Sequence, residues 1–234
     1  MEFIYAKELK KQFICYGHFY ELLLPDTQRL KCRSVLEIVD SHIPQELPSP
    51  ISLMQPDAVV VMMNPGSSHP KNLQHIDETI SYSDTSQKGQ KNLVLTQPDN
   101  TQYQIMRIAL KKNWHHIRVL NLSDLRDPKS GSFIERVESL QEILGGHLHS
   151  IFSPERTQEC NHAIQRKRKN AILLGWGGNE RLIPLAKQCL KQLEGEPLCQ
   201  VPSPAKNPYL NAHPSPMLQS KKLLWLESTL NLLK

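Results

Sequence analysis

The chain has 234 residues, of which 39% are hydrophobic, and its 28 Lys and Arg against 23 Asp and Glu give a net charge of +5. This length and composition predict one ordinary globular domain. No apolar run approaches membrane-spanning length and the start of the chain lacks a signal peptide's apolar core, so we expect a cytoplasmic protein without a membrane partner.

The five cysteines are scattered along the chain and never spaced as C-x-x-C. Such a distribution is typical of reduced thiols and disfavours a zinc or iron–sulfur site, so we expect no metal and no cofactor. The positive charge is compatible with a polyanionic partner but does not require one.

The N-terminal part predicts two extended runs, over residues 13–24 and 30–39, joined by a turn at Pro25-Asp26-Thr27. A proline-rich crossing then leads to a first core strand, Ala58–Met63. Residues 67–98 are polar without hydrophobic periodicity, which predicts a long loop. We therefore divide the chain into a β-rich extension (1–50) and an α/β domain (51–234), together forming one compact unit.

Helices and strands alternate in the rest of the chain. Asp99, a good N-cap residue, begins a predicted helix. Strands are expected over 116–122, 171–176 and 198–201, and helices over 133–144, from Ser153-Pro154-Glu155 onward, over 181–193 and over 221–233. This alternation predicts a three-layer α/β/α fold with a short, mostly parallel four-stranded sheet, plus the N-terminal antiparallel extension. The carboxyl ends of parallel strands collect functional groups at one edge.

Met63-Asn64-Pro65-Gly66 follows the first core strand directly. Asn64 is interpreted either as a turn asparagine or as an amide that orients a water molecule. An oxocarbenium-like transition state needs a well-placed nucleophile more than a strong base, so an amide suffices there. Gly66 is interpreted either as a plain turn glycine or as a gap that a substrate substituent fills.

His213-Pro214-Ser215-Pro216 forms a second stiff corner. His213 is either a structural histidine or a neutral imidazole that donates to a carbonyl oxygen of a departing base. Ser215 is suited to a DNA phosphate. Met217 is either packed or an apolar wedge into a base stack.

Asn121 ends the second predicted core strand. A buried amide there must find partners, either as a satisfied core asparagine or as a bidentate reader of a base edge. Trp176-Gly177, at the end of the third strand, is either core filler or a wall of the site.

Together these motifs resemble the uracil-DNA glycosylase superfamily over roughly residues 56–220. The first motif is similar to the mismatch-specific form, and Met217 stands where that family carries its intercalating leucine. The chain is also similar to uncharacterised bacterial domains with an N-P…N-L…W-G…H-P pattern. The segments that carry the resemblance to the superfamily are Met63–Gly66, Val119–Asn121, Leu173–Gly177 and Ala212–Pro216. Asp99-Asn100-Thr101 and Arg126-Asp127-Pro128 are similar to segments of the bacterial domains.

The resemblance implies a monofunctional DNA glycosylase that flips a nucleotide out of the duplex and hydrolyses its N-glycosidic bond, leaving an abasic site. It implies Asn64 and His213 as catalytic residues. The implied base-binding residues are Met63, Gly66, Asn121 and, as the stacking aromatic, Tyr82; the implied DNA-binding residues are Ser67, Gly177, Ser215 and Met217.

The uracil-specific branch of that family carries a tyrosine where this chain has Gly66. We therefore expect a damaged, mismatched or 5-modified pyrimidine, such as a mismatched thymine or a hypermodified phage cytosine, in DNA repair or antiviral defence. We expect a monomer with DNA as its partner. No lysine stands at the motif positions, so no Schiff-base lyase step is expected.

Two other functions stay open at this stage. A glycosidase of free nucleosides or nucleotides would share the pocket but lack DNA affinity, whose steep salt dependence separates the two. A non-catalytic protein that binds modified nucleic acid would keep the affinity and release no base.

Overall fold

The structure of the chain is a computed structural model that describes residues 3–43, 51–82, 84, 91–144 and 148–233. The helices are α1 (Ala6–Gln12), α2 (Asn100–Lys112), α3 (Ser130–Leu144), α4 (Thr157–Ala163), α5 (Ile183–Gln192) and α6 (Gln219–Leu232). The strands are β1 (Phe13–Leu23), β2 (Arg29–Asp40), β3 (Ala58–Met62), β4 (His69–Pro70), β5 (Glu78–Ser81), β6 (Val94–Gln97), β7 (His116–Asn121), β8 (Ile172–Gly175) and β9 (Leu198–Gln200). Short 3₁₀ helices are Ile51–Leu53, Pro154–Arg156, Lys167–Lys169 and Glu180–Leu182.

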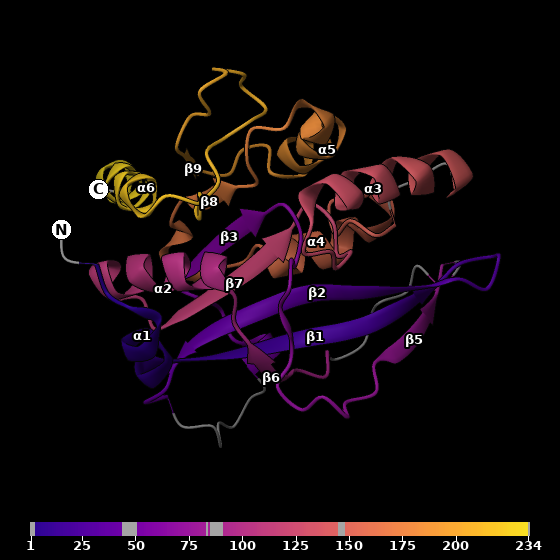
Figure 1. Cartoon of the computed structure of the whole chain (residues 1–234), viewed down its shortest axis with the longest axis horizontal. Helices are drawn as coiled ribbons and strands as arrows, with labels where there is room; N and C mark the ends of the chain where they lie inside the picture. The colour runs from indigo at the N-terminus through magenta and orange to yellow at the C-terminus, as the bar shows by residue number, and fades with distance from the viewer. Residues whose placement is uncertain (1–2, 44–50, 83, 85–90, 145–147, 234) are drawn as a thin grey trace.

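The described strands form one mixed sheet in the order β4-β6-β1-β2-β7-β3-β8-β9, with β5 paired to β1 (Figure 1). The block β7, β3, β8 and β9 is parallel, whereas β2 pairs antiparallel with both β7 and β1. The predicted α/β class is confirmed. The prediction of a short, mostly parallel four-stranded sheet is corrected, because the N-terminal strands continue the same sheet and the described sheet has nine strands.

The strand β2 explains this correction. Its residues from Cys32 to Val39 are all buried, so it behaves as an internal strand and not as an appended edge. Its pairing with β7 joins the expected extension to the expected α/β domain through backbone hydrogen bonds. The boundary predicted near residue 50 falls among residues 44–50, outside the described part of the chain.

The segment 67–98 was expected as a loop, and its described part instead contains β4, β5 and β6. These short strands pair with β1 or with one another. Their hydrogen bonds come from distant strands, so local periodicity gave no signal for them. Residues 83 and 85–90 of this segment lie outside the described residues, as does the predicted stop at Gly145-Gly146.

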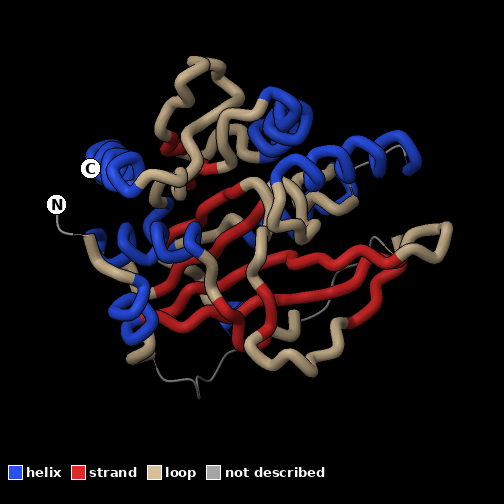
Figure 2. The backbone as a smooth tube through the Cα atoms, viewed as in Figure 1, coloured by secondary structure: helices blue, strands red, loops and turns tan. Residues whose placement is uncertain are grey.

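Helices cover both faces of the sheet, as the buried valines of β3 show. Val59 and Val61 pack in a core with residues of α3, α4 and α5. Val60 packs in a second core with residues of α1, α2 and α6. A strand covered on both faces has apolar residues at consecutive positions, as the sequence shows from Val59 to Met63. Figure 2 shows the β1–β2 hairpin in the lower part of the view and α5 and α6 in the upper part, near the opposite end of the strand order.

The parallel block places three strand ends side by side. Met62 at the end of β3 pairs with Asn121 at the end of β7 and with Gly175 at the end of β8. The turns that follow these strands therefore start from one edge of the sheet, as expected for parallel strands.

Candidate active site

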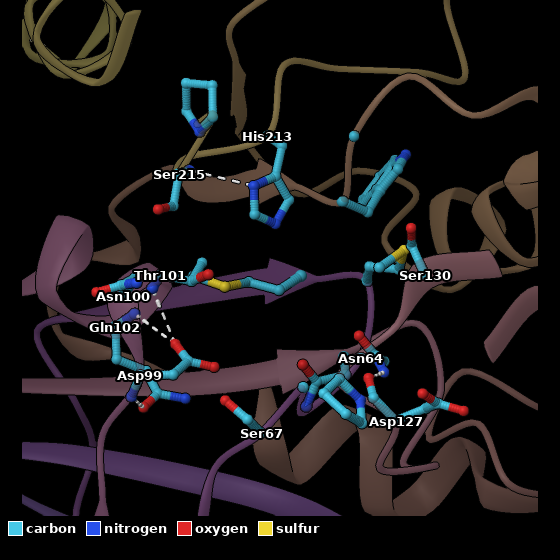
Figure 3. Close-up of a pocket in the computed structure, with 18 of the residues that line it drawn as sticks. Asn64, Ser67, Asp99, Asn100, Thr101, Gln102, Asp127, Ser130, His213 and Ser215 are labelled. Carbon is cyan, nitrogen blue, oxygen red and sulfur yellow. Dashed lines mark hydrogen bonds between the residues drawn. The ribbon is translucent and has the colours of Figure 1, made fainter. Parts of the chain in front are cut away.

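A cavity of about 680 Å³ lies at this edge (Figure 3). Its walls come from the turns after β3 and β8, the start of α2, and the segment before α6. The volume is within the ~300–1,000 Å³ typical of small-molecule sites. The cavity lining includes nine of the residues predicted from the sequence: Met63, Asn64, Gly66, Ser67, Asn121, Gly177, His213, Ser215 and Met217.

Asn64 is held by the loop that follows β7. Its side-chain nitrogen donates to the backbone carbonyl of Asp127 at 2.8 Å and, at a long 3.4 Å, to that of Leu125. These bonds occupy the donor end of the amide, so the Oδ1 atom is the end left to accept a hydrogen bond in the cavity (Figure 3). The amide is therefore oriented to receive a hydrogen bond from water.

His213 projects into the same cavity from the opposite wall (Figure 3). Its Nδ1 atom accepts the backbone N–H of Ser215 at 3.1 Å. Burial lowers the pKa of His213 below its ordinary value of 6.5, so the ring is neutral. A neutral imidazole with Nδ1 as acceptor carries its proton on Nε2. His213 is therefore a hydrogen-bond donor toward the cavity.

Three contacts seat the segment that carries His213. The backbone N–H of Ala212 donates to the Val201 carbonyl at 2.8 Å. The buried Gln104 of α2 donates to the Pro214 carbonyl at 3.0 Å. A β-carbon added to Gly175 would lie 2.8 Å from the Pro214 ring, so only glycine at the end of β8 allows this approach.

Asn121 is fully buried beneath the cavity. One orientation of the Asn121 amide satisfies both of its ends. In this orientation its nitrogen donates to the backbone carbonyl of Asn64 at 3.1 Å, and its oxygen accepts from Arg33 Nη2 at 3.3 Å. The geometry is that of a core asparagine with protein partners. A direct base-reading role for Asn121 stays a prediction.

Asp99 is a cavity residue that the sequence predicted as a helix cap and as part of the similarity to uncharacterised bacterial domains, without a role in the site. Its Oδ1 accepts the backbone N–H groups of Thr101 at 2.9 Å and Gln102 at 3.2 Å, and Gln102 returns the capping-box bond (Figure 3). The cap was identifiable from Pro98-Asp99. The cap uses only one oxygen of the Asp99 carboxylate, which leaves Oδ2 for another partner at the start of α2. This second oxygen was the signal for a role in the cavity.

Arg33 and Lys222 also line the cavity and were not predicted. Arg33 comes from β2, in the segment expected to be a separate extension, so nothing in the local sequence connects it with the site. Lys222 comes from α6 and is a lining residue, as are Ser215 and Met217 from the segment before this helix. Met217 itself is 97% exposed.

Gly66 has φ of +63°, a left-handed conformation that favours glycine. A β-carbon there would lie 3.1 Å from Asp99 Oδ2. The turn therefore favours glycine. That the gap at Gly66 holds a substrate substituent stays a prediction.

Tyr82 is not brought to the cavity, and its predicted base-stacking position is corrected. It follows β5, which pairs with the far end of β1, and its backbone N–H donates to the Leu23 carbonyl at 2.9 Å. Its side chain packs against the core shared with α3, α4 and α5. Among the described aromatic residues, Trp176 does line the cavity; it is buried and donates to the Tyr209 carbonyl at 3.0 Å.

No protein-family model, curated protein or solved structure matches this chain. Across the described residues, no helix is long and apolar enough to cross a membrane, and no group of His, Cys, Asp and Glu is arranged to hold a metal ion. The function is therefore inferred from the chemistry of the cavity.

Proposed function

We propose that the protein is a monofunctional DNA glycosylase that hydrolyses the N-glycosidic bond of a flipped-out pyrimidine. The observation that carries this proposal is the convergence of two residues far apart in the chain on one cavity. Asn64 offers an acceptor and neutral His213 offers a donor from opposite walls. The resemblance to the uracil-DNA glycosylase superfamily, with its mismatch-specific first motif, supports the same reaction.

Each residue has a separate task in the reaction. Asn64 Oδ1 accepts from a water molecule and aims its oxygen at the anomeric carbon of the sugar. The bond from this carbon to the base nitrogen breaks as the water oxygen bonds to it, through an oxocarbenium-like transition state. The base departs as an anion, and the Nε2–H of His213 donates to its carbonyl oxygen. The attacking water releases a proton to solvent, and the departed base anion takes up a proton from solvent.

The rim of the cavity suits a DNA substrate. Extruding a nucleotide costs a few kcal/mol, which contacts to the duplex must offset. In this proposal Met217, whose side chain is exposed, fills the gap in the base stack. Lys222 and Ser215 supply the charge and hydrogen bonds that phosphates need.

Incubation with defined DNA tests this proposal. Duplexes that contain uracil, mismatched thymine or modified cytosines are assayed for alkali-labile abasic sites. We expect cleavage of at least one substrate, and a loss of about 10²-fold or more in rate for Asn64→Ala and for His213→Ala.

Two exposed residues provide matched controls. Asn72, in a surface turn, and His42, with a largely exposed side chain, are outside the cavity lining, so Asn72→Ala and His42→Ala should keep the wild-type rate. Release of base from free nucleosides but not from DNA would indicate a nucleoside glycosidase. Tight binding without release would indicate a non-catalytic binder.

A further inference from the structure

A buried glutamine of α2 contacts the segment that carries His213. Gln104 is fully buried, and both ends of its side-chain amide have partners. The nitrogen Nε2 donates to the backbone carbonyls of Pro214 and Lys222, each at 3.0 Å, and the oxygen Oε1 accepts from Arg107 Nη1 at 2.8 Å. A guanidinium has no acceptor atom, so Oε1 must face Arg107 and Nε2 must face the two carbonyls. The orientation of this amide is therefore fixed.

Arg107 brings a positive charge to this amide. Its side chain is buried, its Nε donates to the Ile4 carbonyl at 2.8 Å, and its guanidinium carbon lies 3.9 Å from the centre of the Phe3 ring. Burial lowers the pKa of Arg107 to about 10, which still leaves the guanidinium charged at neutral pH. Hydrogen bonds that follow one another polarise one another, so the charge of Arg107 makes the Gln104 amide a stronger donor.

The peptide group between Pro214 and Ser215 takes part in two hydrogen bonds. Its carbonyl accepts from Gln104, and its N–H donates to Nδ1 of His213 at 3.1 Å (Figure 3). A trans peptide is planar, and its C=O and N–H point in opposite directions. A bond that fixes the carbonyl therefore also fixes the direction of the N–H. As a result, the His213 ring keeps Nδ1 as the acceptor and its proton on Nε2.

These hydrogen bonds all run in one direction, from the charge on Arg107 toward the cavity. Arg107 donates to Gln104, Gln104 donates to the peptide group after Pro214, and this peptide group donates to His213. Each group that accepts at one end becomes a stronger donor at its other end. His213 is the last of these groups, and its Nε2–H is the donor that faces the cavity. The charge of Arg107 therefore acts on the imidazole without protonating it.

We propose that Gln104 and Arg107 form a hydrogen-bond relay that holds His213 in its Nε2–H tautomer and strengthens it as a donor to the ligand. Gln104 is the positioning residue of this relay, and Arg107 fixes its amide and supplies the charge. Neither of them is among the described residues that line the cavity, so both act through His213. The effect of the relay on the excision rate rests on the proposed function, whereas its effect on the His213 ring does not.

The state of the His213 ring tests the relay directly. In ¹⁵N-labelled protein, the chemical shifts of the two ring nitrogens report which of them carries the proton. We expect the Nε2–H tautomer in the wild type and a mixture of both tautomers in Gln104→Met, whose side chain cannot donate to the Pro214 carbonyl. Gln192→Met is the matched control, because Gln192 Nε2 donates to Thr157 Oγ1 at 2.9 Å and Gln192 is not a described lining residue. An unchanged His213 ring in Gln104→Met would overturn the relay.

Two variants of Arg107 separate its charge from its packing. Arg107→Met removes the charge and the bond to Gln104 Oε1, whereas Arg107→Lys keeps a charged donor on a flexible chain. We expect the single-turnover excision rate to fall about 10–100-fold in Gln104→Met and in Arg107→Met, the range known for residues that orient a histidine at metal sites. Arg107→Lys should keep most of the wild-type rate. Equal losses in Arg107→Lys and Arg107→Met would overturn the role of the charge.

A double-mutant cycle shows whether the relay acts through His213. When His213→Ala is already present, Gln104→Met should cause no further loss of rate, because the relay then has no ring to act on. The same loss with and without His213 would indicate a general effect on the fold and overturn the relay. A changed His213 ring in a protein that releases no base would support the relay while contradicting the glycosylase. Base release at the full rate in Gln104→Met would keep the glycosylase and overturn the relay.

Discussion

At the scale of single residues, function depends on which atoms the protein already uses. Asn64 and His213 each have one polar end occupied by a backbone group, which turns the amide into an acceptor and the imidazole into a donor. Asn121 has both ends occupied by protein partners. The residue type left a structural and a functional role open for each asparagine, and the partners of each amide show which of its atoms are already used.

Arg33 should make an unfavourable contribution to stability. Replacing it with methionine, which is similar in length and apolar, removes a buried charge that lacks described hydrogen-bond partners at two of its nitrogens. We expect Arg33→Met to raise the free energy of unfolding by about 1–3 kcal/mol, measured by denaturant titration. A destabilised variant would show that Arg33 is satisfied in the free protein. Arg29→Met, on the exposed start of β2, is the control.

The lowered pKa of His213 predicts a pH dependence of stability. Near pH 6.5 the unfolded chain binds a proton on this residue and the folded protein does not. The folded state is therefore destabilised as the pH falls through about 6.5, and the effect is absent at higher pH. We expect the difference in unfolding free energy between wild type and His213→Gln to change in favour of the variant below that pH. The excision rate should stay constant down to the same pH, because the imidazole remains neutral. A difference in unfolding free energy that does not change with pH would contradict a buried neutral ring.

At the scale of elements, the end of β8 and the segment before α6 must meet closely to place His213. Gly175→Ala should push the Pro214 ring away, since the added β-carbon would lie 2.8 Å from it. We expect a loss of about 1–3 kcal/mol in stability from this overpacking, together with a fall in excision rate larger than the fall in DNA affinity. Gly131→Ala, where a β-carbon meets nothing within 4 Å, is the control. An unchanged rate would show that the position of His213 does not depend on this contact.

At the scale of the whole molecule, the N-terminal strands belong to the cores of the protein. Tyr20 and Val35 pack in the core shared with α3, α4 and α5, and Leu36 and Ile38 pack in the core shared with α1, α2 and α6. A fragment of residues 51–234 would also expose the edge of β7. We expect this fragment to aggregate or to lack a cooperative unfolding transition, measured by circular dichroism and gel filtration. A folded, cooperative fragment would restore the division of the chain near residue 50.

Much of the α/β pattern was predictable because it depends on local signals. The four strands of the parallel block were predicted from short strand-like segments that alternate with helices, and Asp99 was predicted as a helix cap. The short strands β4, β5 and β6 gave no such signal, since their partners lie far along the chain. Tyr82 was misplaced for the same reason, because pairing of β5 with β1 takes it away from the cavity.

The sequence by itself determined which residues stand at strand ends and in proline-stiffened turns, and so predicted Asn64 and His213 as a pair. Only the tertiary structure decided that β2 is an internal strand of the same sheet, which brings Arg33 beneath the cavity. The physical reason is that strand order is set by hydrogen bonds and buried surface between distant segments. The order of residues along the chain does not reveal these contacts. Arg33 therefore could not be identified as a cavity residue before the fold was known.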